Sequence, residues 1–218
     1  TNTESTLHLL KFALSVGCKR FVYASSMSVY GEKPDRPVSE SETAVPKSFY
    51  GVGKLASEHY LRLYEQYGIK STALRLFNVY GPGQNMNNLK QGMISIFMQQ
   101  MLQGDLILVK GAKDRYRDFI YIDDVVDCFI KCLEGNALLP RVLNVGTGRR
   151  TTVEQLLTLL GGLHDNDVRV EYSGTTAGDQ HGIYADISLI KKYLDFSSEV
   201  NLEYGLAKML KWARGNEL

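Results

Sequence analysis

The sequence predicts an α/β protein built on a parallel sheet. Apolar and β-branched runs that fit strands occur at residues 19–26, 71–77 and 142–145. A run at 50–67, with apolar side chains at helical spacing and no proline, separates the first two strands. The order strand, helix, strand is typical of the crossover that joins parallel neighbours.

The other elements follow in order along the chain. A helical pattern at 6–16 ends at Gly17, 32–46 is rich in Pro, Ser and Glu as in surface loops, and a polar loop starts at Gly81. A capping box with Glu154 suits a helix that begins near Thr151 or Thr152. The remaining expected elements are a helix at 93–102, a strand at 106–109, a charged turn at 112–117, a strand opening at 117–119, helices at 123–133 and 153–160, a strand at 168–172, and helices at 188–193 and 202–212.

Charge and cysteine content narrow the function classes. The 218 residues carry a net charge of +1, which argues against nucleic acid as the main partner. No apolar run approaches the ~20 residues of a membrane span and no signal peptide precedes the first strand, so we expect a soluble cytoplasmic protein without a membrane partner. The three cysteines, Cys18, Cys128 and Cys132, lack the spacing of a metal site and are interpreted as buried free thiols.

Tyr50 and Lys54 lie one helical turn apart, so the phenol and the ammonium share a face. A tyrosine that acts as a base at neutral pH needs its pKa lowered by about three units, or roughly 4 kcal/mol. One ammonium about 4 Å away, at an effective dielectric of about 20, contributes on the order of 4 kcal/mol. The alternative is an ordinary exposed pair on an amphipathic helix.

Ser26 supplies a third member. It ends the strand at 19–26, and strand ends are where open α/β sheets place ligand chemistry. A serine hydroxyl can donate to a substrate oxygen while the tyrosine takes the proton. The alternative is that Ser25 and Ser26 only form a turn.

These residues belong to a series of motifs spread over the chain. They are FVYASSMSVYG at 21–31, YGVGKLASE at 50–58, LRLFNVYGPG at 74–83, RDFIYIDDV at 117–125, LNVGTG at 143–148, and GD at 178–179 with YAD at 184–186. In this order they resemble the extended short-chain dehydrogenase/reductases, and within them the nucleotide-sugar epimerase/dehydratase group typified by UDP-galactose 4-epimerase.

The resemblance implies a fold and a domain division. It implies the C-terminal part of a Rossmann-like parallel sheet, with 1–84 and 115–148 forming the second half of the NAD-binding domain. Residues 85–114 and 149–218 would form a smaller α/β substrate-binding lobe. In the family about a hundred residues come first and hold the glycine-rich pyrophosphate turn; because the Gly146–Gly148 turn lacks the third glycine, the chain is expected to be a fragment of a longer enzyme.

The resemblance also implies roles for individual residues. Ser26, Tyr50 and Lys54 would be catalytic, with Lys54 lowering the tyrosine pKa and binding the nicotinamide ribose. The implied cofactor is NAD, contacted by Tyr50, Lys54, Phe77 and Ser25. The implied substrate contacts are Asn78, Asn88, Leu89, Arg117, Asp179 and Ile183, with Arg117 and Asn78 at the diphosphate.

Three departures from the family pattern bear on the substrate. Thr176 stands near the glycine of the GD motif where epimerases usually have a phosphate-binding arginine, which leaves the nucleotide open. Met27 and Ser28 stand where 4,6-dehydratases carry two carboxyl groups, which disfavours dehydration. Ile183 stands where some epimerases carry a tyrosine beside the sugar's second carbon, so an N-acetyl group is expected to fit.

The resemblance therefore predicts an NAD-dependent nucleotide-sugar epimerase, most simply a 4-epimerase of a hexose or N-acetylhexosamine nucleotide. Two alternatives remain: an NADP-dependent keto-sugar reductase, and a noncatalytic sugar-nucleotide binding module. A homodimer through the helices at 6–16 and 50–67 is also implied.

Overall fold

The computed structural model describes residues 2–88, 92–104, 106–134, 138–164, 167–174 and 181–215. Two predicted substrate contacts, Leu89 and Asp179, lie outside these residues, as does Thr176.

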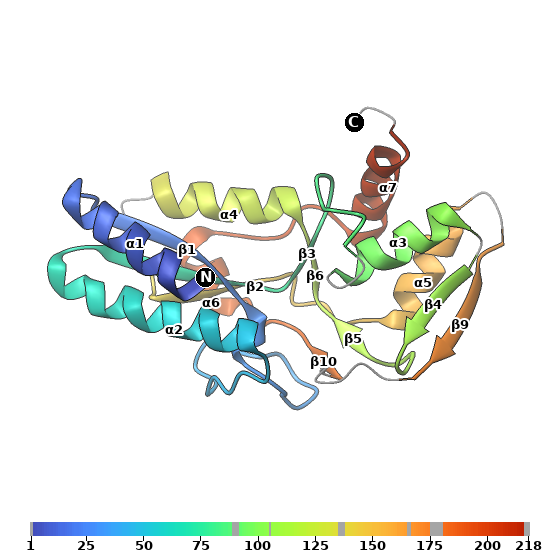
Figure 1. Cartoon of the computed structure of the whole chain (residues 1–218), viewed down its shortest axis with the longest axis horizontal. Coiled ribbons are helices and arrows are strands. Elements are labelled where there is room, and N and C mark those ends of the chain that lie inside the picture. Colours follow the sequence, from blue (N-terminus) through green and yellow to red (C-terminus); the bar gives the residue numbers. More distant parts are fainter. Residues whose placement is uncertain are drawn as a thin grey trace.

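A three-stranded parallel sheet forms one end of the molecule (Figure 1). Its strands are β1 (Arg20–Ser26), β2 (Lys70–Leu76) and β7 (Val142–Val145), in the order β1-β2-β7. The parallel register aligns Ser26 with Leu76, so the carboxyl ends of β1 and β2 meet at one edge. The predicted α/β class and parallel crossover are confirmed.

Helices cover both faces of this sheet. They are α1 (Asn2–Ser15), α2 (Phe49–Tyr64), α4 (Ile122–Glu134) and α6 (Ser188–Leu194). Ala73 on β2 packs with Leu10 and Leu61 of α1 and α2, whereas its neighbour Leu74 belongs to the core beneath α4 and α6. Successive strand residues point to opposite faces, so β2, which is buried on both faces, contributes alternate residues to the two cores.

A second core lies at the other end of the molecule (Figure 1). It joins α3 (Met93–Gln103), α5 (Val153–Gly162) and α7 (Leu202–Ala213) to the parallel pair β4 (Leu106–Lys110) and β9 (Arg169–Ser173). The division into two domains at the predicted boundaries stays a prediction.

Short strands link the two ends. β3 (Asn78–Tyr80) pairs with β6 (Phe119–Tyr121), and β5 (Tyr116–Arg117) lies between β10 (Gly182–Ile183) and β8 (Thr151–Thr152). The prediction of a charged turn through 117 was therefore wrong at its end, because Tyr116 and Arg117 are buried strand residues.

The α5 capping box differs from the predicted one. Thr152 is the N-cap, and Gln155, not Glu154, completes the box, because the reciprocal bond comes from the third residue after the cap. Glu154 instead accepts a hydrogen bond from Lys113 at 2.8 Å.

Cys128 and Cys132 on α4 are buried free thiols, as predicted, and Cys18 is a free, partly buried thiol. Burial raises the pKa of both α4 thiols, that of Cys132 to about 11, so neither is reactive at neutral pH. None of the described helices is long and apolar enough to cross a membrane.

Candidate active site

The start of α2 is held close to the end of β1. Ser48 caps the helix, its hydroxyl accepting from the Gly51 amide at 3.0 Å. A Cβ at Gly51 would lie 2.6 Å from the Ser28 carbonyl oxygen, so only glycine permits this approach. The residue before it, Tyr50, is thereby placed beside the short 3-10 turn Met27–Val29 that follows Ser26.

One face of α2 is fastened to the last residues of β1. Tyr50, Lys54 and Glu58 recur every fourth residue and share that face. The Lys54 ammonium donates to the Ala24 carbonyl at 2.8 Å and lies 5.5 Å from the centre of the Tyr50 ring. One turn further along α2, Glu58 Oε1 accepts from the Ser25 hydroxyl at 2.5 Å. Two consecutive β1 residues are thus tied to α2 directly before Ser26.

A buried ion pair extends this connection to β2. Arg75 donates to Glu58 through Nε at 3.0 Å and Nη2 at 2.7 Å, and the two side chains are 6% and 7% exposed. Burial by itself would lower the pKa of Arg75, but the hydrogen bonds and charge of Glu58 hold it above its ordinary value. The sequence analysis missed Glu58, although its spacing of four residues after Lys54 was a usable signal.

A cavity of about 550 Å³ opens at the carboxyl ends of β1 and β2. Open α/β sheets bind ligands at this edge, and the volume lies in the range of small-molecule sites. Its lining residues are Ser25, Ser26, Met27, Ser28, Tyr50, Leu76, Phe77, Asn78, Val79, Tyr80, Gln84, Asn85, Asn88, Gly92, Met93, Ile94 and Phe119.

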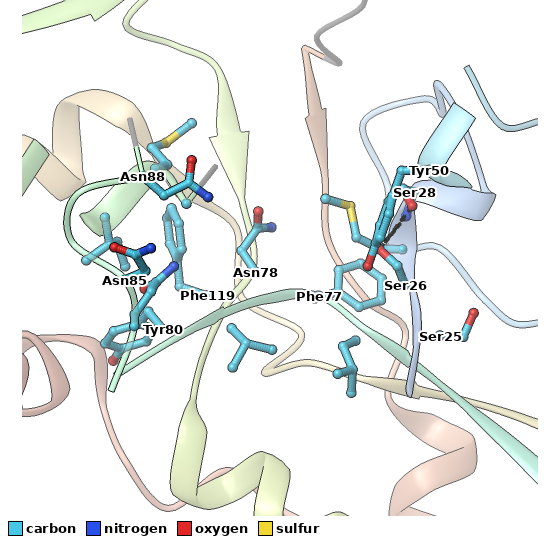
Figure 2. Close-up of a pocket in the computed structure, with 17 residues that line it drawn as sticks. Ser25, Ser26, Ser28, Tyr50, Phe77, Asn78, Tyr80, Asn85, Asn88 and Phe119 are labelled. Atoms are coloured by element: carbon cyan, nitrogen blue, oxygen red, sulfur yellow. Dashed lines mark hydrogen bonds between the residues drawn. The ribbon is translucent and has the colours of Figure 1, made fainter. Parts of the chain in front are cut away.

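Hydroxyl and amide groups are grouped on different sides of this cavity. In the view of Figure 2, Ser26, Ser28 and Tyr50 lie together on one side, and Asn85 and Asn88 on the other, with Asn78 between them. The described lining residues include no Asp, Glu, Lys, Arg or His. Uncharged donors and acceptors of this kind suit the hydroxyl groups of a sugar.

Most of the predicted site residues come together here. Ser26 and Tyr50 line the cavity, and so do the predicted cofactor contacts Ser25 and Phe77. Since Ser25 donates its hydroxyl hydrogen to Glu58, a contact with a ligand would use its oxygen lone pairs or its backbone.

The predicted substrate contacts Asn78 and Asn88 also line the cavity. Lys54 does not line the cavity, but its ammonium lies 5.5 Å from the centre of the Tyr50 ring. Sequence reasoning missed Gln84, Asn85 and Tyr80; the loop that contributes the first two was interpreted only as polar.

Two predicted substrate contacts lie away from the cavity lining. Arg117 is 5% exposed, and its Nη1 donates to the carbonyls of Tyr116 and His181 at 2.7 and 3.2 Å. Ile183 is 1% exposed and packs in one cluster with Phe77, which does line the cavity. Their contacts with substrate stay predictions.

Asp118, which follows Arg117, fixes the backbone around this region. Its carboxylate is fully buried and accepts hydrogen bonds from Thr147 N and Oγ1, Gly148 N and Ala185 N at 2.6 to 3.1 Å. The turn after β7 and the segment after β10 are therefore both held by Asp118, which lies between β5 and β6. The motif at 117–125 has this structural role whatever Arg117 binds.

Comparison with known proteins agrees with the fold and the site. The family model described as "NAD dependent epimerase/dehydratase family" matches residues 1–146. A putative UDP-glucose 4-epimerase of Methanocaldococcus jannaschii is 32% identical over 219 residues, which cover 99% of this chain and 70% of that protein.

A reductase is also among the relatives. The dTDP-4-dehydro-6-deoxyglucose reductase of Escherichia coli is 32% identical over 215 residues, covering 98% of this chain and 67% of the reductase. Among solved structures, the UDP-glucose 4-epimerase of Thermotoga maritima with UDP-glucose superposes with a TM-score of 0.90 at 35% identity, over 99% of this chain and 70% of that one.

The fold and the site define an α/β enzyme of the short-chain dehydrogenase/reductase type. The chain belongs to the NAD-dependent epimerase/dehydratase family, whose cofactor is NAD. It spans about 70% of the length of the M. jannaschii and T. maritima relatives.

Proposed function

We propose that the protein is a nucleotide-sugar 4-epimerase that acts by transient oxidation of the sugar. The observation that carries the proposal is the pairing of the Ser26 and Tyr50 hydroxyls on one side of an uncharged, amide-lined cavity. A 4-epimerase needs one group that takes a proton from the hydroxyl at the fourth carbon and one that holds the same oxygen.

The side chains at this edge of the sheet fit NAD. The Lys54 ammonium has three N–H donors, of which one goes to Ala24, and ammonium donors suit ribose hydroxyls. Tyr50, Phe77 and Ser25 would complete the contacts of the nicotinamide end. These residues would hold NAD, which would supply a reversible hydride acceptor for the fourth carbon.

Each catalytic side chain then has a separate task. Tyr50 as a phenolate takes the hydroxyl proton and later gives it back, so the tyrosine ends each cycle unchanged. Ser26 holds the oxygen during both transfers, and Lys54 supports the negative charge on the phenol. The 4-keto sugar must present its opposite face between the transfers, and a wide, uncharged cavity permits that movement.

The chemistry of the lining disfavours dehydration. Elimination of water requires an acid and a base beside the departing hydroxyl. Met27 and Ser28 supply neither, and there is no carboxylate among the described lining residues. Acceptance of N-acetylhexosamine nucleotides, argued from Ile183, belongs to the same proposal.

A second candidate function is reduction of a keto sugar. The similarity to the E. coli reductase supports it, and the proposed serine, tyrosine and lysine would serve a reductase as well. The two candidates differ in stoichiometry: a reductase consumes one reduced cofactor per product, and an epimerase consumes none.

We also propose that the protein dimerises through α1 and α2. The two helices lie side by side, with the Ser57 hydroxyl donating to Thr6 at 3.2 Å. Their outer faces expose large apolar side chains to an unusual degree. They include Leu9, Phe12 and Leu14 on α1 and Phe49, Val52 and Leu63 on α2.

The experiment is a product analysis with the full-length protein, NAD and UDP-glucose. Proton NMR of the sugar region should show UDP-galactose accumulating to equilibrium, with no 4-keto-6-deoxy sugar and no net change in NADH absorbance. A 4-keto-6-deoxy product would contradict the proposal, as would turnover that stops when reduced cofactor is exhausted.

A further inference from the structure

The turn after β1 controls how the Ser26 hydroxyl can be used. Ser26 Oγ accepts a hydrogen bond from the Ser28 amide at 3.2 Å and a second one from the Ser28 hydroxyl at 3.0 Å. Figure 2 shows this contact beside the Tyr50 ring. Both bonds come from one residue, and both end on the oxygen that the proposed mechanism places next to the sugar.

The hydrogen-bonding capacity of a hydroxyl is limited. A serine oxygen has two lone pairs and one O–H donor. Since Ser28 occupies both lone pairs, the remaining function of Ser26 is to donate its own hydrogen. Without the Ser28 hydroxyl, the Ser26 hydroxyl would gain a free lone pair and could rotate to accept a hydrogen bond from the substrate.

This difference matters for the proposed chemistry. When Tyr50 removes the proton from the hydroxyl at the fourth carbon, that oxygen gains negative charge and is stabilised by donors and repelled by lone pairs. If the Ser26 hydroxyl can only donate, it is preorganised to stabilise this negative charge before the substrate binds.

We propose that Ser28 is a positioning residue that fixes Ser26 as a hydrogen-bond donor toward the oxygen on the fourth carbon of the sugar. This inference rests on the proposed epimerase function. Ser28 acts through Ser26, and a direct contact of Ser28 with the sugar is the competing explanation that the experiment must separate.

The test is a double-mutant cycle on epimerisation of UDP-glucose by the full-length protein with NAD. Ser28→Ala should lower kcat about 10-fold, as expected for loss of one hydrogen bond in the transition state, with KM nearly constant. Ser26→Ala should lower kcat about 100-fold. In the Ser26→Ala background, Ser28→Ala should change kcat by less than about twofold, because the group on which it acts is gone.

Two further variants complete the design. Ser28→Thr keeps the hydroxyl and should restore most of kcat. Ser41→Ala is the matched control. Ser39 and Ser41 are also two residues apart in sequence, their hydroxyl oxygens are 2.8 Å apart, and neither residue lines the cavity. It should leave kcat unchanged.

Independent effects would overturn the inference: a further 10-fold loss in the double variant, or a raised KM with unchanged kcat in Ser28→Ala. Failure of the wild type to epimerise any UDP-hexose would instead contradict the proposed function, and this inference with it.

Discussion

The ion pair between Glu58 and Arg75 makes a prediction about stability. Glu58→Gln replaces a carboxylate that accepts three hydrogen bonds, from Ser25 and from two nitrogens of Arg75. The glutamine oxygen can accept some of these bonds, but its amide nitrogen would face another donor. The Arg75 guanidinium, 6% exposed, would be left without a counter-charge.

The expected cost follows from that burial. Removing one partner of a buried pair costs about 3–5 kcal/mol. For a domain of this size, a loss of about 3 kcal/mol lowers Tm by roughly 10 °C. A matched control is Glu65→Gln, because Glu65 pairs with Arg141 at 2.7 Å but the side chains are 22% and 61% exposed. Exposed pairs contribute about 0–1 kcal/mol.

Thermal and urea unfolding of the two variants beside wild type would measure the difference. The double variant Glu58→Gln/Arg75→Met should recover part of the loss, since it removes the uncompensated charge. If Glu58→Gln is no more destabilising than Glu65→Gln, the pair does not connect α2 to the sheet in the way described above.

Three further predictions concern other parts of the chain. Burial raises the pKa of Glu40 above its ordinary value of 4.5, so the contribution of Glu40 to the stability of the folded protein falls as pH rises above 4.5. Between pH 4 and 7, the free energy of unfolding of the wild type should therefore fall relative to that of Glu40→Gln. A constant difference between the two proteins would contradict this. The Phe12→Glu change on the exposed face of α1 should shift the protein from dimer to monomer in sedimentation velocity, and an unchanged distribution would exclude that face. Ile183→Tyr should reduce kcat/KM for UDP-N-acetylhexosamines more than for UDP-hexoses. An equal loss for both would show that the larger side chain only disturbs the packing around this buried position and that residue 183 does not select the sugar.

Periodicity and turn chemistry were sufficient to predict the elements that form the sheet. The runs that became β2 and β7 are mostly buried, the run that became β1 is mostly half-buried and rich in β-branched and aromatic residues, and α2 contains no proline. The two-residue strands β5, β8 and β10 carry no such signal, because two residues cannot show a period and their pairing depends on distant partners.

The site was predictable in part for a similar reason. Tyr50, Lys54 and Ser26 lie in local motifs, and the fold brings Tyr50 and Ser26 to one cavity. Glu58 acts through Ser25 and Arg75, which are 33 and 17 residues away in sequence, and such a contact appears only when the strands are aligned. The burial of Arg117 also depends on chain contacts that spacing does not reveal.

The central claim is that Tyr50 is the proton acceptor of a sugar 4-epimerase. The most direct test is kcat for conversion of UDP-glucose to UDP-galactose by full-length Tyr50→Phe, with Tyr64→Phe as a control on the same helix but outside the cavity lining. We predict that Tyr50→Phe lowers kcat at least ~100-fold with little change in substrate affinity. Tyr64→Phe should match wild type. Equal turnover by Tyr50→Phe and wild type would contradict the mechanism.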